Sequence, residues 1–343
     1  MKVFWHPIQQ RHSPKFFLQR GKLRQNFEVP ARAEALLAAV KSMGLDVVEP
    51  AQVERAVLET VHAPDYLSFL ERAAADWAAL PDHGEELVAN THPTPEMLAG
   101  GARKSATIVG ELGWYTADTA CPIGPGTWPA AEAAAAGAIA AAEEAAAGRV
   151  AYALARPPGH HSYAARAAGH CYLNNAALAA QHLLDRGAGR VAVLDIDSHH
   201  GNGTQGILWR RGDVFFASIH ADPNRYYPWY VGHADEIGAG DGEGFNLNQP
   251  LAFGSGDEAW LAAIGRALAA VDRVGVDALV VSLGFDASKD EPLAALMVTE
   301  DGFAKAGVRI AALRKPTAII QEGGYAVSVI GGLLTRFLAS FAG

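Results

Sequence analysis

Carboxylates and imidazoles follow two apolar runs of this sequence, at the points where those runs end. The run 191–196 is followed by Asp197 and His199, and the run 278–283 is followed by Asp286. Buried carboxylates and imidazoles are unfavourable unless they pair with one another, reach solvent or bind a metal. Two Asp oxygens and one His nitrogen leave positions open for water and substrate, as a catalytic Zn²⁺ requires, and Fe²⁺ or Co²⁺ suits the same set. A lone Asp is more often a solvated loop residue, but the combination favours a metal centre.

Two further clusters add groups that hydrolysis needs. The turn 156–159 (Arg-Pro-Pro-Gly) precedes the tandem imidazoles His160 and His161, and a Gly-Gly pair precedes Tyr325. One His can act as general base toward a metal-activated water, with the other as its electrostatic or acid partner, because His titrates near neutrality. The phenol can donate a hydrogen bond to a developing oxyanion. Taken alone, each cluster is also compatible with a structural role.

Short apolar runs alternate with helix-like segments along the chain and must position these groups. We expect strands at 3–5, 46–48, 150–155, 191–196, 214–219, 278–283 and 317–321, and helices at segments that include 31–42, 176–186 and 257–273. This alternation is typical of an α/β fold with a mostly parallel central sheet flanked by helices on both faces. Ligands in such folds bind beyond the carboxyl ends of the strands, where the candidate groups stand.

No linker or change of composition divides the chain, so we expect a single domain over residues 1–343. The stretch at about 81–128 is rich in Gly, Pro and Thr and lacks clear periodicity. Long excursions of this kind commonly shape a site or an interface.

Composition bounds the classes of function. Lys plus Arg total 28 and Asp plus Glu total 37, which gives a net charge of −9 and argues against a general nucleic-acid binder. The two cysteines, Cys121 and Cys171, have no paired spacing, which favours a reducing cytoplasm. His6 and Pro7 interrupt the first apolar stretch, so a signal peptide is not expected. The alanine-rich stretch 130–147 carries glutamates, which favours a packed helix over a membrane span.

Six motifs stand in order over nearly the whole chain: Val61-His62-Ala63-Pro64-Asp65-Tyr66-Leu67, Arg156 to His161, Gly169-His170-Cys171-Tyr172-Leu173-Asn174-Asn175, Asp195 to Gly203, Gly284-Phe285-Asp286 and Glu322 to Tyr325. Together they resemble the motifs of the histone deacetylase and acetylpolyamine amidohydrolase family, within the arginase/deacetylase superfamily. The resemblance implies a single-domain arginase/deacetylase-like fold.

The resemblance also implies roles for the candidate residues. It implies one catalytic Zn²⁺ held by Asp197, His199 and Asp286. It further implies that His161 is the general base, that His160 is its electrostatic or acid partner, and that Tyr325 polarises the scissile carbonyl. The implied reaction is attack of a metal-activated water on an amide carbonyl, which yields an acid and a free amine.

Neighbouring positions complete the implied site. Asp195 resembles the carboxylate that orients His160. Asn202 stands where many histone deacetylases have Asp, so the second imidazole would have a neutral partner. A structural K⁺ is implied as well, at the positions Asp195, Asp197, His199, Ser218 and Ile219.

The excursion resembles that of the bacterial acetylpolyamine amidohydrolases, in which it narrows the site entrance and helps to form a homodimer. The resemblance therefore implies a small N-acylated amine as substrate, such as an acetylpolyamine, and a homodimer as the assembly. The implied channel residues are Asp118, Gly169, His170, Tyr227 and Leu293. Asp118 aligns with an acidic residue suited to a cationic amine, whereas His170 and Tyr227 replace more apolar aromatics and make the channel more polar. A lysine deacylase acting on peptides or proteins, a hydrolase of other small amides, and a binding protein without turnover are the alternatives.

Overall fold

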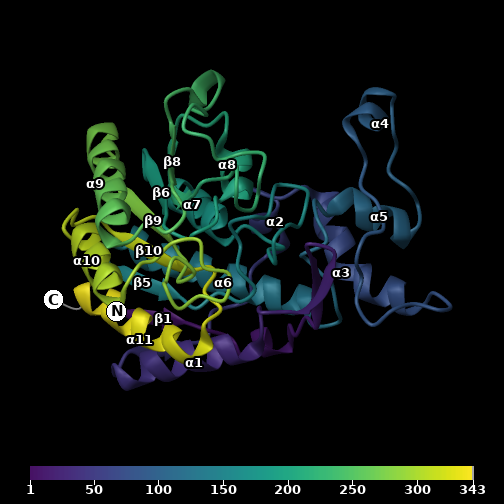
Figure 1. Cartoon of the computed structure of the whole chain (residues 1–343), viewed down its shortest axis with the longest axis horizontal. Coiled ribbons are helices and arrows are strands. Elements are labelled where there is room, and N and C mark those ends of the chain that lie inside the picture. Colours follow the sequence, from purple (N-terminus) through teal and green to yellow (C-terminus); the bar gives the residue numbers. More distant parts are fainter. Residues whose placement is uncertain (342–343) are drawn as a thin grey trace.

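An eight-stranded sheet runs through the centre of the computed structural model, which describes residues 1–341 (Figure 1). The last two residues of the expected domain, 342–343, lie outside the described residues. Every pair of neighbouring strands is parallel. In sheet order the strands are β4 (Asp46–Val48), β1 (Lys2–Phe4), β5 (Val150–Ala153), β10 (Thr317–Gln321), β9 (Ala278–Leu283), β6 (Val191–Asp195), β7 (Val214–Ala221) and β8 (Asn246–Leu251).

Both faces of the sheet are covered by helices, as the sequence predicts. Along β9, Leu279 and Val281 belong to one apolar cluster, whereas Ala278 and Val280 belong to another, because successive side chains point to opposite faces. The first cluster includes α1 (Pro30–Ser42), α9 (Asp257–Val274), α10 (Glu300–Ala311) and α11 (Val327–Leu338). The second includes α6 (Thr127–Ala146) and α7 (Asn175–Asp185). Burial on both faces explains why these strands read as continuous apolar runs.

The strand boundaries differ from the expected ones at the site. Strand β6 ends at Asp195, so Asp197 and His199 lie in the loop that follows, before the short helix α8 (Asn202–Leu208). Two further elements were not predicted: edge strand β8, which is rich in Asn and Gln, and a small antiparallel hairpin of β2 (Phe16–Gln19) and β3 (Lys22–Gln25). Strands β8 and β3 lack the apolar run on which the prediction relied, whereas the short run of β2 (Phe-Phe-Leu) was overlooked.

The excursion contains two short helices that were not expected. The chain passes from α2 (Arg55–Leu58) and α3 (Pro64–Ala78) into an arm with α4 (Pro95–Ala99) and α5 (Ile108–Tyr115). Figure 1 shows α4 at the far end of this arm. A bridge between Leu87 and Ile123 joins the two ends of the arm, and both residues belong to a third apolar cluster with α3 and α5. The arm is therefore anchored at its base by its own packing.

The alanine-rich stretch forms α6, and many of its alanines are buried against the sheet and α7. Within residues 1–341, no helix combines the length and apolarity that crossing a membrane requires.

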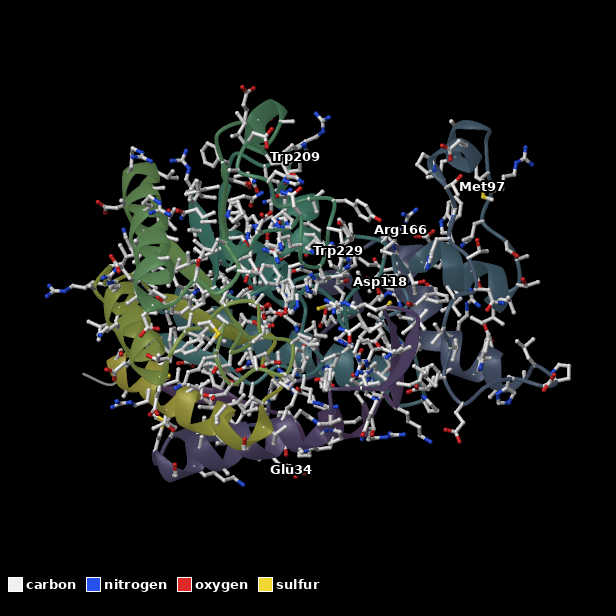
Figure 2. The ribbon with its side chains drawn as sticks, in the orientation of Figure 1. Glu34, Met97, Asp118, Arg166, Trp209 and Trp229 are labelled. Atoms are coloured by element: carbon white, nitrogen blue, oxygen red, sulfur yellow. The ribbon has the colours of Figure 1, made fainter. Side chains whose placement is uncertain are left out.

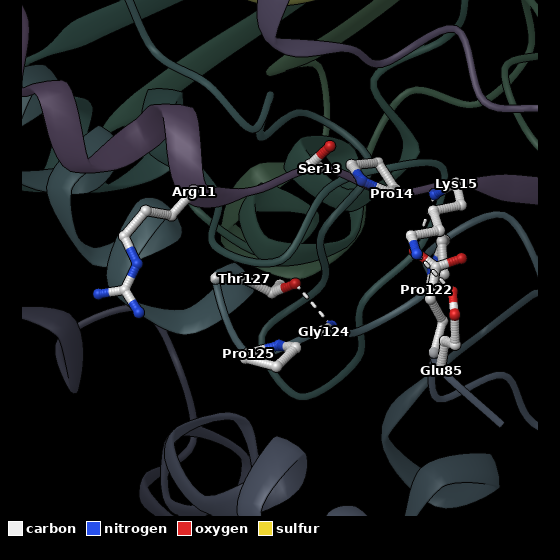
Figure 3. Close-up of a pocket in the computed structure, with 11 residues that line it drawn as sticks. Arg11, Ser13, Pro14, Lys15, Glu85, Pro122, Gly124, Pro125 and Thr127 are labelled. Atoms are coloured by element: carbon white, nitrogen blue, oxygen red, sulfur yellow. Dashed lines mark hydrogen bonds and ion pairs between the residues drawn. The ribbon is translucent and has the colours of Figure 1, made fainter. Parts of the chain in front are cut away.

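A cavity of about 170 Å³ lies where the N-terminal segment meets the end of the arm (Figure 3). Glu86 lines it and accepts a hydrogen bond from the backbone N–H of Lys15 at 2.8 Å. Thr127, at the start of α6, accepts one from the N–H of Gly124 at 2.9 Å. None of the site residues expected from the sequence lines this cavity.

Candidate metal and catalytic site

The three expected metal ligands lie together beyond the carboxyl ends of β6 and β9. Nδ1 of His199 is 2.9 Å from Oδ2 of Asp286 and 3.1 Å from Oδ1 of Asp197. One ligand atom from each residue lies within 4.8 Å of the others, and all three side chains are buried or nearly so. Gly284 allows this approach, because a Cβ atom there would lie 2.0 Å from Oδ2 of Asp197.

The geometry and charge of this group fit a divalent cation. Ligand atoms about 2.0 to 2.2 Å from a tetrahedral Zn²⁺ lie about 3.3 to 3.6 Å apart, slightly more than the distances from Nδ1 of His199 to the two carboxylates. Asp195 adds a third buried carboxylate. No Lys or Arg side chain within residues 1–341 hydrogen-bonds to any of these three aspartates. The positive charge that these buried carboxylates need can come from the imidazoles of His160 and His199 when protonated, or from a bound cation.

Backbone donors orient the ligand carboxylates. The N–H groups of His199 and Gly323 donate to the two oxygens of Asp197 at 2.8 and 2.9 Å. The N–H of Ser198 donates to Oδ1 of Asp286 at 2.7 Å. Each carboxylate is thus fixed before any ion binds, and Oδ2 of Asp286 is left facing His199.

The tandem imidazoles flank the metal ligands, and each has a different partner. His160 donates from Nδ1 to Oδ2 of Asp195 at 3.0 Å, and its Nε2 lies 3.8 Å from Oδ1 of Asp197. His161 donates from Nδ1 to Oδ1 of Asn202 at 2.6 Å. Both bonds leave Nε2 as the ring nitrogen that can exchange a proton with a substrate.

The two imidazoles differ in pKa as a result. Burial alone would lower the pKa of His160, but the carboxylates of Asp197 and Asp195 outweigh it and raise that pKa to about 10. Burial lowers the pKa of His161 well below its usual value, and the charges of His160 and His199 lower it further. The ring centroids of His160 and His161 are only 3.9 Å apart, so the two are not readily protonated together.

Tyr325 follows the carboxyl end of β10, at the same edge of the sheet as the expected metal ligands. Within residues 1–341 no group hydrogen-bonds to its hydroxyl, whereas its ring lies 4.7 Å below the guanidinium of Arg32. Arg32 also donates from Nε to the carbonyl of Gly324 at 2.6 Å and from Nη2 to that of Glu322 at 2.7 Å. The phenol is therefore held at its ring and backbone, and its hydroxyl is left for a ligand.

The remaining positions of the expected K⁺ set are adjacent in the sheet. Asp195 of β6 stands in register with Ser218 of β7, and Ile219 follows Ser218 in the same strand. The Ser218 hydroxyl lies 2.9 Å from Nδ1 of His220.

Three of the expected channel residues, Asp118, Gly169 and Tyr227, contact one another beside His161. Oδ2 of Asp118 accepts hydrogen bonds from the hydroxyl of Tyr227 at 2.6 Å and from the N–H of Gly169 at 3.2 Å. The Tyr227 ring stands perpendicular to that of His161, with centroids 4.8 Å apart. Gly169 has φ +49, and a Cβ atom there would lie 2.5 Å from Cδ2 of His161, so this position requires glycine. In Figure 2 Asp118 lies at the base of the arm, whose far end carries Met97.

His170 and Leu293 complete that set. The His170 ring packs edge-on against Tyr325, with centroids 6.0 Å apart, and burial lowers its pKa to about 4. The carbonyl of Leu293 accepts a hydrogen bond from the hydroxyl of Tyr226, whose ring stacks on the metal-ligand candidate His199 at 4.5 Å.

Comparison with known proteins decides the family. Residues 26–341 match the family described as the histone deacetylase domain. The chain belongs to this family. It is 46% identical over 325 residues to acetylpolyamine amidohydrolase 1 of Pseudomonas aeruginosa, which covers 94% of this chain and 93% of that protein. It is 44% identical over 344 residues to the acetylpolyamine amidohydrolase of Burkholderia pseudomallei, with 99% and 98% covered.

The fold agrees with that assignment. The crystal structure of the acetylpolyamine aminohydrolase from Burkholderia pseudomallei superposes with a TM-score of 0.95 at 42% identity, over 100% of this chain and 98% of that one. The arginase/deacetylase-like architecture expected from the motifs is therefore confirmed.

Sequence reasoning missed the residues that support the site of this histone deacetylase family member. Oε2 of Glu322 accepts the N–H groups of Gly159 and His160 at 2.7 and 3.1 Å, and burial raises the pKa of Glu322 to about 7. It fixes the backbone at the tandem imidazoles. Its place in the Glu-Gly-Gly-Tyr motif was a signal, but its role depends on a partner far away in the chain.

A buried ionic cluster lies behind Tyr325 and was also missed. Glu28 is fully buried and contacts Arg32 at 2.8 Å and Arg156 at 2.7 Å. In the sequence, Glu28 and Arg32 read as an ordinary pair four residues apart, which is usually a solvated surface contact. Only the fold shows that the pair is buried.

Proposed function

We propose that this chain is a Zn²⁺-dependent amidohydrolase that removes the acetyl group from acetylpolyamines or similar small N-acylated amines. The observation that carries the proposal is the joint placement of the Asp197–His199–Asp286 group, two differently paired imidazoles and a phenol with a free hydroxyl. The reaction consumes one water and one amide and yields acetate and a protonated amine. When bound, Zn²⁺ supplies Lewis acidity toward the carbonyl and lowers the pKa of water.

The protein groups divide the proton transfers between them. Nε2 of His161 is free to take the proton of the attacking water, since Nδ1 already donates to Asn202. His160, held by Asp195, contributes positive charge beside the developing oxyanion, and a protonated imidazole returns the proton to the leaving amine. Tyr325 donates its hydroxyl hydrogen bond to the former carbonyl oxygen.

The amine preference rests on relatives and on charge. The relatives at 46% and 44% identity are named for acetylpolyamines. Asp118 places a carboxylate in the wall of the channel beside Tyr227, where an ammonium group of the substrate would meet it. We propose that the arm at 81–128 narrows this entrance and takes part in a homodimer, and that K⁺ binds beneath the catalytic metal at the Asp195 and Ser218 positions.

A lysine deacylase is the second candidate, favoured by the match to the histone deacetylase domain. The experiment that separates the two measures kcat/KM of the zinc-loaded protein for N-acetylputrescine, an acetyl-lysine peptide and a neutral N-alkylacetamide. We expect the highest value for N-acetylputrescine. A higher value for the peptide would support the second candidate, and a higher value for the neutral amide would move the substrate class to other small amides.

A further inference from the structure

Glu291 is a buried carboxylic acid that contacts the backbone of the tyrosine loop, the segment 322–326 between β10 and α11. It lies in the loop between β9 and α10, on the chain that leaves the metal-ligand candidate Asp286, and only 5% of it is exposed. Its Oε2 accepts hydrogen bonds from the N–H of Tyr325 at 2.9 Å and from the N–H of Ala326 at 3.3 Å. Glu291 thus joins the loop that presents a metal ligand to the loop that presents the phenol.

These two N–H groups lie at the start of α11. The residue at the N-cap is Ala326, whose side chain cannot accept a hydrogen bond. The first N–H groups of a helix have no partner within it, and they form its positive end. Glu291 accepts the N–H of the N-cap residue and of the residue before it, and that preceding residue carries the phenol.

The environment of the second oxygen of Glu291 indicates that the carboxyl group has a role other than packing. Oε1 is buried, and within residues 1–341 it has no hydrogen-bond partner. An unpaired buried oxygen destabilises the fold, so an apolar side chain would serve packing alone better. Burial, followed by the charge of Asp286, raises the pKa of Glu291 to about 8.

The tyrosine loop needs external anchors because of its own sequence. Gly323 and Gly324 precede Tyr325 and have no side chains to pack, and Gly324 has φ +114. Arg32 anchors the carbonyls of Glu322 and Gly324, whereas Glu291 anchors the following N–H groups. Without Glu291, the N–H groups of Tyr325 and Ala326 would lose these acceptors, and the backbone of Tyr325 would keep only the contact of its carbonyl with the N–H of Val327 among the described hydrogen bonds.

We propose that Glu291 is a positioning residue that sets the location of the Tyr325 hydroxyl for the reaction. The inference rests on the proposed function, because it gives Tyr325 the role of polarising the carbonyl. It goes beyond that function by assigning the placement of this hydroxyl to a residue that acts through the backbone N–H groups of Tyr325 and Ala326.

A double-mutant cycle tests this role. We would measure kcat and KM for N-acetylputrescine in wild type, E291A, Y325F and E291A/Y325F, each with its bound zinc quantified. We expect E291A to lower kcat about tenfold with KM little changed, and to lower the residual kcat of Y325F by less than about twofold. E291Q keeps an oxygen acceptor and should restore most of the lost kcat. The matched control is D290A, which removes the adjacent exposed carboxylate and should leave kcat unchanged.

A merely structural role would give a different pattern. If E291A lowered kcat equally in both backgrounds, or left kcat unchanged in the wild-type background, the positioning role would be wrong. A second readout needs no turnover: the affinity for a short alkyl hydroxamate, whose carbonyl would meet the Tyr325 hydroxyl. We expect the E291A and Y325F losses of affinity to be non-additive. If the losses of affinity are non-additive but the protein does not hydrolyse N-acetylputrescine, positioning is supported and the proposed function is contradicted. If the losses of affinity are additive, the positioning role is wrong and the proposed function is unaffected.

Discussion

The imidazole of His161 is paired with an amide: its Nδ1 lies 2.6 Å from Oδ1 of Asn202. The neighbouring imidazole, His160, is paired with the carboxylate of Asp195. An amide fixes the tautomer as a carboxylate does, but it adds no negative charge to hold a proton on the ring. The pairing therefore divides the two histidines into one that keeps its proton and one that is free to accept a proton.

Replacing Asn202 by Asp should change the pH dependence of the reaction. The added carboxylate would raise the pKa of His161, which must be neutral to act as a base, so the acidic limb of kcat/KM should move to higher pH. A pH–rate profile of N202D checks this, with the exposed substitution N224D as a control of equal charge. An unmoved limb in N202D would show that His161 is not the base.

Removing the Tyr325 hydroxyl should affect kcat alone. Loss of one donor to a developing oxyanion commonly lowers kcat by about 10² to 10³. We expect Y325F to show a loss in this range, with bound zinc and KM close to those of wild type. Y230F, which removes the hydroxyl of a tyrosine that is 86% exposed, should behave as wild type. Full activity in Y325F would rule out the assigned role.

The carboxylate of Asp118 should select for cationic substrates. We expect D118N to raise KM for N-acetylputrescine about tenfold and to change KM for a neutral N-alkylacetamide little. Y227F loses the bond to Asp118 but keeps the carboxylate. It should therefore retain the preference for the cationic amide. Equal KM changes for both substrates in D118N would indicate that Asp118 only braces the channel wall.

His62 should make the fold sensitive to acid. Its Nε2 accepts the N–H of Asn174 at 2.9 Å, and burial lowers its pKa from 6.5 to about 4. Below about pH 6.5 the unfolded chain takes up a proton at His62 that the folded chain does not bind until about pH 4. Stability therefore falls across this window, by about 2 kcal/mol at about pH 5 from this residue.

The variant H62Q, which cannot take up this proton, should show a smaller drop in Tm between about pH 7 and about pH 5 than wild type. The exposed residue His83 provides the control, since H83Q should keep the wild-type slope. An unchanged slope in H62Q would contradict the assignment.

The candidate metal-ligand group could be predicted from the sequence for a physical reason. Parallel strands end at a common edge, so polar residues after two apolar runs must meet there. The helices covering both faces were predictable in the same way, from the alternation of β-rich and helical segments. Even so, β6 ends at Asp195, one residue before the expected end of the run, and Asp197 and His199 lie in the loop that follows.

The residues that support the site could not be predicted in this way. Glu322, Glu291 and the Glu28–Arg32 pair act on backbone groups or charges that are distant in sequence, and their burial follows from the assembled fold. Edge strand β8 was missed because Asn and Gln side chains replace its apolar run. Asn246 and Asn248 bond to the adjacent loop, and Gln249 bonds to α9.

The most direct test of the central claim measures acetate released from N-acetylputrescine by protein that has been stripped with a chelator and then titrated with Zn²⁺. The account predicts that activity disappears on stripping and returns fully at one equivalent of Zn²⁺. It predicts that D286N, titrated in the same way, neither retains the ion nor recovers activity. Acetate release by the stripped protein, or full recovery of D286N at one equivalent, would contradict an amidohydrolase centred on Asp197, His199 and Asp286.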